Sequence, residues 1–450
     1  MRPNKLNKIA ALLAVAGISA PAFATNGMNM EGYGPVATGM GGASFAYDNG
    51  TAGMINNPAT LGFMKSGTAR FDIAIGGLHP DVAASMPAVP AMGTANSGGD
   101  AYYMPAAGYV RKDGKLTYGI GMMAQGGMGT EYGNNSFLSF SPTLGGPTGQ
   151  ENRSELGLGR VMFPLAYDVT DSFTVGGSID YLWGGLDIQM VMDGAAMGAM
   201  MAPGGNAIGV VTSTLPPIPM DWAQFDFSKG DNKFTQQLTT NGWALNIGFT
   251  WKAAPNLTVG GVYHAKTNLS DMEGSGRLNS SAGPIAGKLS VIDFQWPETY
   301  GLGLAYQASD KLLIAADYKR INWADVMKNL RMHFVADGGL GTMDATLYQN
   351  WKNQDVFMIG ASYKYSPALT LRAGVNLASN PIPDNYLNYL FPATIKDHYA
   401  LGFGYAFSQA ASIDFSYTYA PEVSVTNSVM GIKTTHGQSN NWQFMYSHRF

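Results

Sequence analysis

The chain has 450 residues, of which 13% are charged, 12% are aromatic and 58 are glycine, and it contains no cysteine. A typical soluble domain carries about 25% charged residues, so the composition argues against an ordinary soluble protein. The net charge of −4 argues against a nucleic-acid partner. No apolar run reaches the ~20 residues of a membrane-spanning helix, which indicates that the hydrophobicity is distributed in alternation.

Residues 1–24 have the pattern of a secretory signal peptide. Three basic residues precede the apolar run from Ile9 to Ala20, and Ala22-Phe23-Ala24 follows it as a small-x-small cleavage site. This order of a basic, an apolar and a small-residue region is typical of segments that are removed during export. We therefore expect the mature chain to begin at Thr25.

Residues 25–66 do not have the pattern of a strand. They are short and rich in glycine, with Gly39-Met-Gly-Gly-Ala43 in the middle and Asn57-Pro58-Ala59 near the end. Such a segment is too small for a separate domain. We expect it to fill the inside of a barrel as a hatch, because a wide barrel with small inward side chains otherwise leaves an open aqueous lumen.

Residues 67–450 repeat one unit, in which a tight polar turn joins two alternating strands of about ten residues, the length that crosses a bilayer when tilted. The turns are rich in residues that hairpins use. Long segments rich in Gly, Pro, Met and Asn connect the pairs, and short turns opposite long loops are typical of outer-membrane proteins. The six turns are residues 111–115, 168–172, 252–256, 307–311, 366–368 and 408–411.

Six hairpins provide twelve strands, and one further strand at each end brings the predicted total to fourteen. The first spans about Thr68 to Leu78, and the last spans Asn440 to Phe450. An even number closes the barrel with both termini on the periplasmic side. The sequence thus predicts an all-β membrane protein, a 14-stranded antiparallel outer-membrane β-barrel, and one misread loop would change the number to twelve or sixteen.

The last strand shows the alternation most clearly. One face carries Trp442, Phe444, Tyr446, His448 and Phe450, and the residues between them are mostly polar. A soluble β-sandwich also alternates, but aromatic residues gathered near strand ends are typical of the girdles of an outer-membrane barrel. A terminal Phe450 resembles the signal that the barrel-assembly machinery reads.

Several short motifs occur in an order that resembles the FadL / OMPP1 / TodX family of hydrophobic-compound transporters, over essentially the whole mature chain. This resemblance implies a barrel with an N-terminal hatch, an extracellular groove, passive transport without a cofactor, and a lateral exit into the bilayer at a kink in the third strand. The motifs are Thr25-Asn-Gly27, Gly39–Ala43, Asn57–Ala59, His79-Pro-Asp81, Gly127–Tyr132, Trp296-Pro-Glu298 and Ser379–Pro383.

Two motifs are candidates for the transport machinery. Gly126, Gly127 and Gly129 lie at the end of the third predicted strand, where glycine permits a bulge or a kink. The resemblance implies the lateral exit there; the alternative is the point where the strand ends and a loop begins. Asn57-Pro58-Ala59 is either a latch of the hatch or a simple turn.

The segment from Met190 to Asp231 is rich in methionine, which forms adaptable apolar surfaces. We expect a short helix from Asp193 to Met201 and a ligand groove between this segment and the loop after the third strand. Ordinary loop packing is the alternative. The groove candidates are Phe137, Leu138, Phe140, Met197, Met200, Met201, Leu215, Ile218 and Trp222.

A fatty-acid cargo would need a basic partner for its carboxylate. Where the fatty-acid members of the family place one, after the fifth strand, this chain has Asp187-Ile188-Gln189. Lys352 and Arg160 are possible replacements, although Arg160 and Arg372 can equally form charge pairs inside the barrel. The sequence therefore leaves fatty acids and uncharged aromatic or aliphatic hydrocarbons open.

Two other functions are weighed against this hydrophobic-compound channel. A general porin for polar solutes would have an unplugged, charged constriction. A lipid-modifying enzyme would need catalytic residues, but the sequence has no Gly-x-Ser-x-Gly elbow and its six histidines are scattered singly. We expect no enzyme, no metal and no cofactor, a monomer, and outer-membrane lipid and lipopolysaccharide as surroundings.

Overall fold

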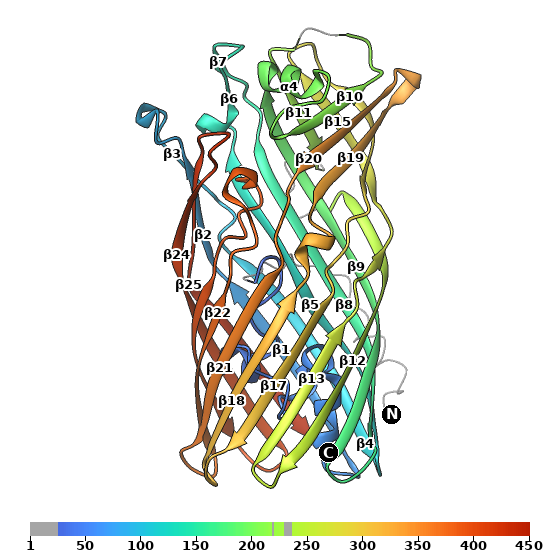
Figure 1. The fold of residues 1–450 in the computed structure, drawn as a ribbon, viewed down its shortest axis with the longest axis vertical. Helices are drawn as coiled ribbons and strands as arrows, with labels where there is room; N and C mark the ends of the chain where they lie inside the picture. Colours follow the sequence, from blue (N-terminus) through green and yellow to red (C-terminus); the bar gives the residue numbers. More distant parts are fainter. Residues whose placement is uncertain (1–25, 218–219, 229–235) are drawn as a thin grey trace, which may run out of the picture.

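The structure is a computed structural model that describes residues 26–217, 220–228 and 236–450. The predicted signal peptide, residues 1–24, and the groove candidate Ile218 lie outside the described residues. The chain folds into a tall β-barrel, with short helices inside its lower half and a crown of further strands above it (Figure 1).

Antiparallel ladders join neighbouring strands into a ring that returns to its first strand. β25 pairs with β1 from Arg70↔Arg449 to Gly77↔Trp442, and this ladder closes the barrel. Closure removes the sheet edges, so backbone groups of the wall find partners within the protein. The ring runs in the order β1 (Thr68–Leu78), β4 (Tyr102–Asp113), β5 (Leu116–Gly133), β8 (Asn152–Asp168), β9 (Phe173–Asp193), β12 (Leu238–Ala254), β13 (Leu257–His264), β17 (Thr299–Gln307), β18 (Leu312–Ile321), β21 (Gln354–Lys364), β22 (Leu369–Ala378), β23 (Asp397–Ala406), β24 (Ala411–Thr426) and β25 (Lys433–Arg449).

The outer face of the wall is apolar, and the inner face carries small and polar residues. On β17, Leu302 and Leu304 are 61% and 48% exposed, whereas the neighbouring Gly301 and Gly303 are buried. A Cβ on Gly301 would lie 2.5 Å from the ring of Phe45, so this glycine faces the lumen. An exposed apolar face is stable only against lipid, and the alternation predicted from the sequence is confirmed.

All six predicted turns join consecutive strands of the ring, and the predicted first strand coincides with β1. The predicted length of about ten residues is too short for several strands. β5 has 18 residues, β8 and β12 have 17 each, and β9 has 21. A tilted strand crosses a bilayer in about 9–11 residues. The remainder of each long strand extends the sheet on the side opposite the short turns, which we expect to be the extracellular side.

The long segments that the sequence predicts as loops contain further strands and short helices. The ring and the extracellular strands form one continuous sheet, and none of the described helices is long and apolar enough to cross a membrane. The further strands are β2 (Pro80–Ser85), β3 (Thr94–Asn96), β10 (Gly209–Ser213), β11 (Trp222–Phe227), β14 (Asn268–Leu269), β15 (Met272–Ser280), β16 (Ile285–Ile292), β19 (Asn329–Ala336) and β20 (Thr342–Tyr348), with the separate pair β6 (Phe140–Ser141) and β7 (Gly146–Pro147). The helices are α2 (Pro35–Thr38), η2 (Gly50–Ala52), α3 (Gly53–Asn56), η3 (Pro58–Phe63), η4 (Pro90–Met92), η5 (Phe137–Ser139), α4 (Gly194–Met201), η6 (Trp323–Asp325), η7 (Asp337–Gly339) and η8 (Asp384–Tyr386).

The N-terminal segment, residues 26–66, lies inside the barrel and is tied to strands on different sides of the ring. Asp317 of β18 accepts two backbone N–H bonds from this segment, at 2.6 and 2.9 Å. Asp72 of β1 accepts a third at 2.9 Å. On another side, Asn57 Nδ2 donates to Phe249 O of β12 at 3.1 Å. The segment therefore spans the lumen.

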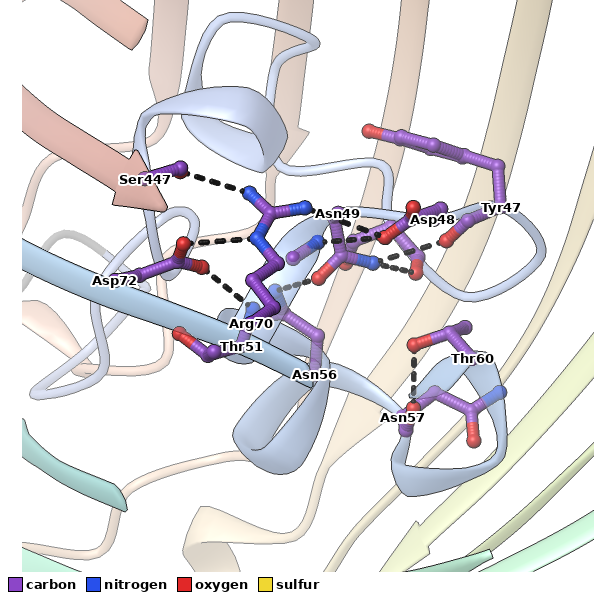
Figure 2. A network of polar contacts seen from close by, with 12 residues as sticks. Tyr47, Asp48, Asn49, Thr51, Asn56, Asn57, Thr60, Arg70, Asp72 and Ser447 are labelled. Carbon is purple, nitrogen blue, oxygen red and sulfur yellow. Dashed lines mark hydrogen bonds and ion pairs between the residues drawn. The ribbon is translucent and has the colours of Figure 1, made fainter. Parts of the chain in front are cut away.

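Arg70 of β1 holds together a polar network between the N-terminal segment and the barrel (Figure 2). Its Nε lies 2.8 Å from Asp72 Oδ1, its Nη2 donates to Ser447 Oγ of β25 at 3.0 Å, and Asp48 of the segment lies at 3.8 Å. A Cβ on Gly50, whose φ is +78°, would lie 2.6 Å from Nη2. Glycine is thus required here both for the backbone conformation and for the close approach.

The chain offers a matched comparison for the buried ion pair. Arg111 and Asp113 have the same spacing and the same 2.8 Å distance as Arg70 and Asp72, but their side chains are 44% exposed, against 6% and 2%. Removing one partner of a buried pair costs about 3–5 kcal/mol. We expect Asp72→Ala to lower the free energy of unfolding by about 3 kcal/mol in urea titrations of protein in lipid vesicles, and Asp113→Ala to leave it unchanged. Equal effects of the two variants would contradict this account of the network.

Candidate functional site

Above the ring, the extracellular segments enclose an apolar cavity of about 240 Å³. Four stretches that are distant in sequence form most of its walls: residues 137–142, 190–196, 385–389 and 427–432. Its described lining contains no lysine, arginine or histidine. Concave apolar sites of this kind bind small hydrophobic ligands. The other apolar side chains in the lining are Met86, Met92, Ile208 and Leu347.

A buried hydrogen-bond network joins the walls of this extracellular cavity. Tyr389 OH donates to Asn152 Oδ1 at 3.2 Å, and Asn152 Nδ2 donates to Leu138 O at 3.1 Å. Tyr132 OH donates to Tyr389 O at 3.0 Å, and the two rings pack edge to face. Burial raises the pKa of the Tyr389 phenol, so it keeps its proton and acts as a donor. These bonds hold the walls of the cavity to one another.

The structure places only some of the predicted groove residues at this cavity. Phe137, Leu138 and Phe140 line it. Helix α4 forms as predicted, but its Met197 and Met200 are buried in the core beneath the helix. Methionines three positions apart share one helix face, and here that face packs inward.

The remaining groove candidates also lie outside the lining. Met201 is 40% exposed, Leu215 packs against the edge of the core, and Trp222 is buried in β11. Met190 and Met192 of β9 line the cavity in their place. The predicted side chains of residues 197–222 that the structure describes therefore lie outside the lining although the cavity adjoins this segment, because composition does not show which face of a helix is covered.

Below the extracellular cavity lies a smaller apolar cavity of about 20 Å³ in the lumen. Gln349 lines both cavities, which places them next to each other. Met28 contributes to the wall of the smaller one, so the N-terminal segment forms its floor. Apolar side chains from five strands and three loops complete it: Met128, Leu156, Leu186, Met272, Phe294, Met327, Leu330 and Phe391.

A third cavity, of about 50 Å³, is polar and lies beside the N-terminal segment. Arg160 and Lys319 both line it, together with Glu31 and His264. Arg160 is already engaged, because its Nη1 lies 2.6 Å from Asp180 Oδ2 and both side chains are buried. This ion pair is the alternative that the sequence left open for Arg160.

The structure places Lys352, the other predicted carboxylate partner, on the surface, where its side chain is exposed and does not line the polar cavity. The lysine in the cavity is Lys319 of β18, which the sequence analysis missed. Alternation contained the signal, because Lys319 is two residues from the lumen-facing Asp317, whereas Tyr318 and Arg320 lie on the other face.

The wall of the barrel is incomplete between β4 and β5. Their ladder begins at Asp113↔Leu116 and ends at Ala107↔Met122. β4 goes on to pair with β1 as far as Leu78↔Tyr102, and β5 goes on to pair with β8, with a shift of register between Ala124 and Gly126. The two strands therefore no longer pair above this point, and we refer to this break in the ladder of the wall as the opening.

The glycines predicted at a kink lie at and beyond this opening. Gly126 sits at the shift of register, and Gly127 and Gly129 follow it in the regular ladder with β8. β5 continues to Gly133, so the alternative that a loop begins at these glycines is wrong. A Cβ on Gly126 would lie 2.1 Å from Met28 O of the N-terminal segment, so the close approach at this point requires glycine.

The first described residues of the N-terminal segment bind the kinked part of β5. Asn29 forms an isolated bridge with Gly126, and Gly127 N donates to Met28 O at 3.2 Å. Asn29 Oδ1 also accepts hydrogen bonds from Gln125 Nε2 at 2.9 Å and from Trp296 Nε1 at 2.6 Å. The segment thus supplies partners for backbone and side-chain groups that the opening leaves without a neighbouring strand.

Two small apolar cavities meet at the opening. One, of about 50 Å³, has Met30 and Tyr33 of the N-terminal segment in its lining. The other, of about 20 Å³, has Trp183 and Gly159 in its lining. Four residues of the opening line both cavities, which places the two next to each other there: Met104, Pro105, Met123 and Ala124.

Asn57-Pro58-Ala59 lies against β9 and β12, away from the kink in β5. Asn57 caps η3 by accepting from Ala59 N at 3.1 Å, and its Nδ2 donates to Phe45 O at 2.7 Å. A Cβ on Gly176 of β9 would lie 2.5 Å from Ala59 N. The motif therefore fastens the end of the N-terminal segment to the wall.

Sequence comparison identifies the family. The pattern of the family described as Outer membrane protein transport protein (OMPP1/FadL/TodX) matches residues 11–446. The chain belongs to this family. Its members are outer-membrane transport proteins and not enzymes, so the predicted family and outer-membrane location are confirmed.

Solved structures of the OMPP1/FadL/TodX family share the fold over almost the whole length. The toluene transporter TodX of P. putida is 30% identical, with a TM-score of 0.82, and the match covers 93% of this chain and 99% of that chain. The toluene transporter TbuX of Ralstonia pickettii is 31% identical, with a TM-score of 0.77 and the same coverage of both chains.

Curated sequences match over shorter regions. Outer membrane protein P1 of Haemophilus influenzae is 27% identical over 179 residues, which covers 40% of this chain and 38% of that protein. An uncharacterized protein of Chlorobium limicola is 58% identical over 72 residues, which covers 16% of this chain and 35% of that protein. The chain thus spans well under half the length of these two relatives.

The contact between Met28 and Gly126 leads to a prediction about local stability. Gly126→Ala should displace residues 26–29 and break the hydrogen bond from Gly127 N to Met28 O, which costs about 1–1.5 kcal/mol and speeds amide exchange about tenfold. Hydrogen exchange followed by mass spectrometry should show faster exchange at residues 126–129. Gly146→Ala is the control, because a Cβ there meets no atom within 4 Å. Unchanged exchange in Gly126→Ala would contradict the predicted contact.

Proposed function

We propose that this protein is a passive uptake channel for small hydrophobic compounds. The fourteen ring strands form the barrel, residues 25–66 form the hatch, and residues 1–24 are a cleaved signal peptide. Cargo enters the extracellular cavity, passes the lumen cavity floored by Met28, and leaves sideways through the opening between β4 and β5. Gly126, Gly127 and Gly129 shape the edge of this exit.

The observation that carries the proposal is the break in the β4–β5 ladder, where two adjoining apolar cavities meet. A hydrophobic solute gains roughly 0.8 kcal/mol for each CH₂ group removed from water. A route that leads from an apolar cavity into lipid keeps this gain, whereas a route into the periplasm loses it. The hatch supports the same direction, because it fills the lumen below the opening.

We propose uncharged hydrocarbons, including monoaromatic ones, as the preferred cargo. The extracellular cavity has no basic residue in its described lining, and Arg160 is paired with Asp180. The similar structures TodX and TbuX are toluene transporters. Lys319 in the polar cavity favours a second candidate class, amphiphiles with a carboxylate such as fatty acids, because their charged end would find a cation there.

The surroundings of the channel follow from its surfaces. The apolar outer face contacts outer-membrane lipid and lipopolysaccharide, and the protein is proposed to act as a monomer. Phe450 follows β25 and is 69% exposed, while its backbone N–H bonds Ala69 O at 2.9 Å. This side chain is proposed as the contact for the barrel-assembly machinery. A general porin is disfavoured, because the N-terminal segment occupies the lumen that polar solutes would need.

Filling the opening tests the lateral route. Ala124 lines both of the cavities that meet there, so Ala124→Trp should obstruct passage. A barrier raised by about 1.4 kcal/mol lowers a rate tenfold, and we expect at least that loss in radiolabelled toluene uptake by cells that carry the variant. Ala361→Trp is the matched control, because Ala361 lies on β21, away from the opening.

Heat-modified mobility on gels would show that both variants are folded. Equal uptake by Ala124→Trp and the unaltered protein would reject the lateral exit. Competition by oleate but not by hexadecane would identify amphiphiles as the cargo class. Free passage of small sugars in liposome swelling would favour the general porin.

A further inference from the structure

One carboxylate joins two walls of the extracellular cavity. Asp193 is the last residue of β9 and precedes α4, and it accepts hydrogen bonds from a loop about fifty residues earlier. Thr143 donates twice, from N to Oδ1 at 2.9 Å and from Oγ1 to Oδ2 at 3.0 Å. Ser141 Oγ donates to Oδ1 at 2.6 Å, and Ala195 N donates to Oδ2 at 3.0 Å as the cap of α4.

Both joined segments contribute lining residues. Phe137, Leu138 and Phe140 belong to the segment that contains Ser141, and Met192 and Ala196 flank Asp193. Asp193 itself lines the cavity. The spacing between the first segment and α4 therefore sets the width of the cavity, and the bonds to Asp193 hold this spacing.

The bond from Ser141 to Asp193 is a weaker link between the segments than the bonds from Thr143. Ser141 Oγ also lies 2.7 Å from Asp221 O, but a hydroxyl has one proton and can donate to only one of the two oxygens at a time. Both bonds that Thr143 donates end on Asp193, and the other link on this side is a longer bond from Ala195 N to Thr143 Oγ1 at 3.3 Å. Loss of the carboxylate would thus leave the Thr143 side of the loop held to α4 by that one long bond.

The chemistry of the site requires an ionised carboxylate rather than an amide. Partial burial raises the pKa of Asp193, but hydrogen bonds from Ser141, Thr143 and Ala195 outweigh it and hold the pKa below its ordinary value. Donors approach both oxygens. An asparagine would offer one oxygen as an acceptor and turn its NH₂ group toward donors on the other side.

We propose that Asp193 is a positioning residue for cargo capture: it clamps the segment 137–147 to α4 and keeps the extracellular cavity at the width that holds a small apolar molecule. This inference rests on the proposed function, because it assigns capture to this cavity. Asp193 need not touch the cargo, since it acts through the walls that it joins.

Binding of the uncharged probe N-phenyl-1-naphthylamine to protein in lipid nanodiscs tests the proposal. The single acceptor oxygen of an asparagine can keep either the cap of α4 or the loop contacts but not both, so Asp193→Asn should raise the dissociation constant about five- to tenfold. Thr143→Val should raise the dissociation constant by a similar factor. The double variant should raise it little further, because both changes break the same clamp. Asp337→Asn, on the exposed η7 turn, removes the same charge and should leave binding unchanged.

A second readout needs no cargo and therefore separates this inference from the proposed function. The chain has no cysteine, so spin labels can be attached at Leu144→Cys, which is exposed, and at Gly198→Cys, where a Cβ meets no atom within 4 Å. The distance distribution between the labels should broaden in Asp193→Asn and remain narrow in Asp337→Asn. An unchanged distribution would overturn the clamp. A broadened distribution with unaltered probe binding would reject its role in capture, while absence of probe binding in the unaltered protein would count against the proposed function.

Discussion

The need to satisfy every backbone N–H and C=O group inside hydrocarbon governs this structure. Closure of the ring by β25 and β1 meets this need for most of the wall. The opening between β4 and β5 is the exception, and there the N-terminal segment provides substitute partners through Met28 and Asn29. The opening in the wall and the position of the N-terminal segment are therefore parts of one solution to the same constraint.

The same constraint acts on charges in the lumen. Arg70 is paired with Asp72, Arg160 with Asp180, and Arg372 of β22 with Asp414 of β24. Pairing removes the cost of leaving a charge alone in a poorly solvated interior. The described walls of the extracellular cavity, in contrast, contain no basic side chain that would attract anions. The lumen is consequently polar around the N-terminal segment and apolar along the route proposed for cargo.

The cavities differ in the way their walls are held. The extracellular cavity is built from four segments, of which three are joined by hydrogen bonds to Asn152, Tyr389 and Asp193 and the fourth by a bond from Asn427 to Leu387 O. The opening is bounded by strands of the ring and by a short stretch of the N-terminal segment. Capture therefore depends on how loops are clamped to one another, and release depends on a few contacts around Gly126. Variants of the two regions should affect different steps.

The sequence alone determined the features that arise from local period and turn chemistry. Alternation in residues 399–419 and the six polar turns indicated the hairpins, and β1 was predicted with its correct bounds, because a strand has a side-chain period of two wherever it lies. In the same way, Gly126, Gly127 and Gly129 indicated the irregular part of β5, where the register shifts. The last strand was predicted to begin at Asn440 but begins at Lys433, because its upper part pairs with β2 in the extracellular sheet.

Only the tertiary structure decided which side chains meet. Met197 and Met200 turned inward, Lys352 lies outside the polar cavity, and Lys319 lies in it. The extracellular cavity combines residues as distant as Phe137 and Ile432. The end of the β4–β5 ladder at Ala107↔Met122 depends on how both strands pair with other neighbours. These are long-range choices of register and packing, and a local pattern contains no information about the partner strand.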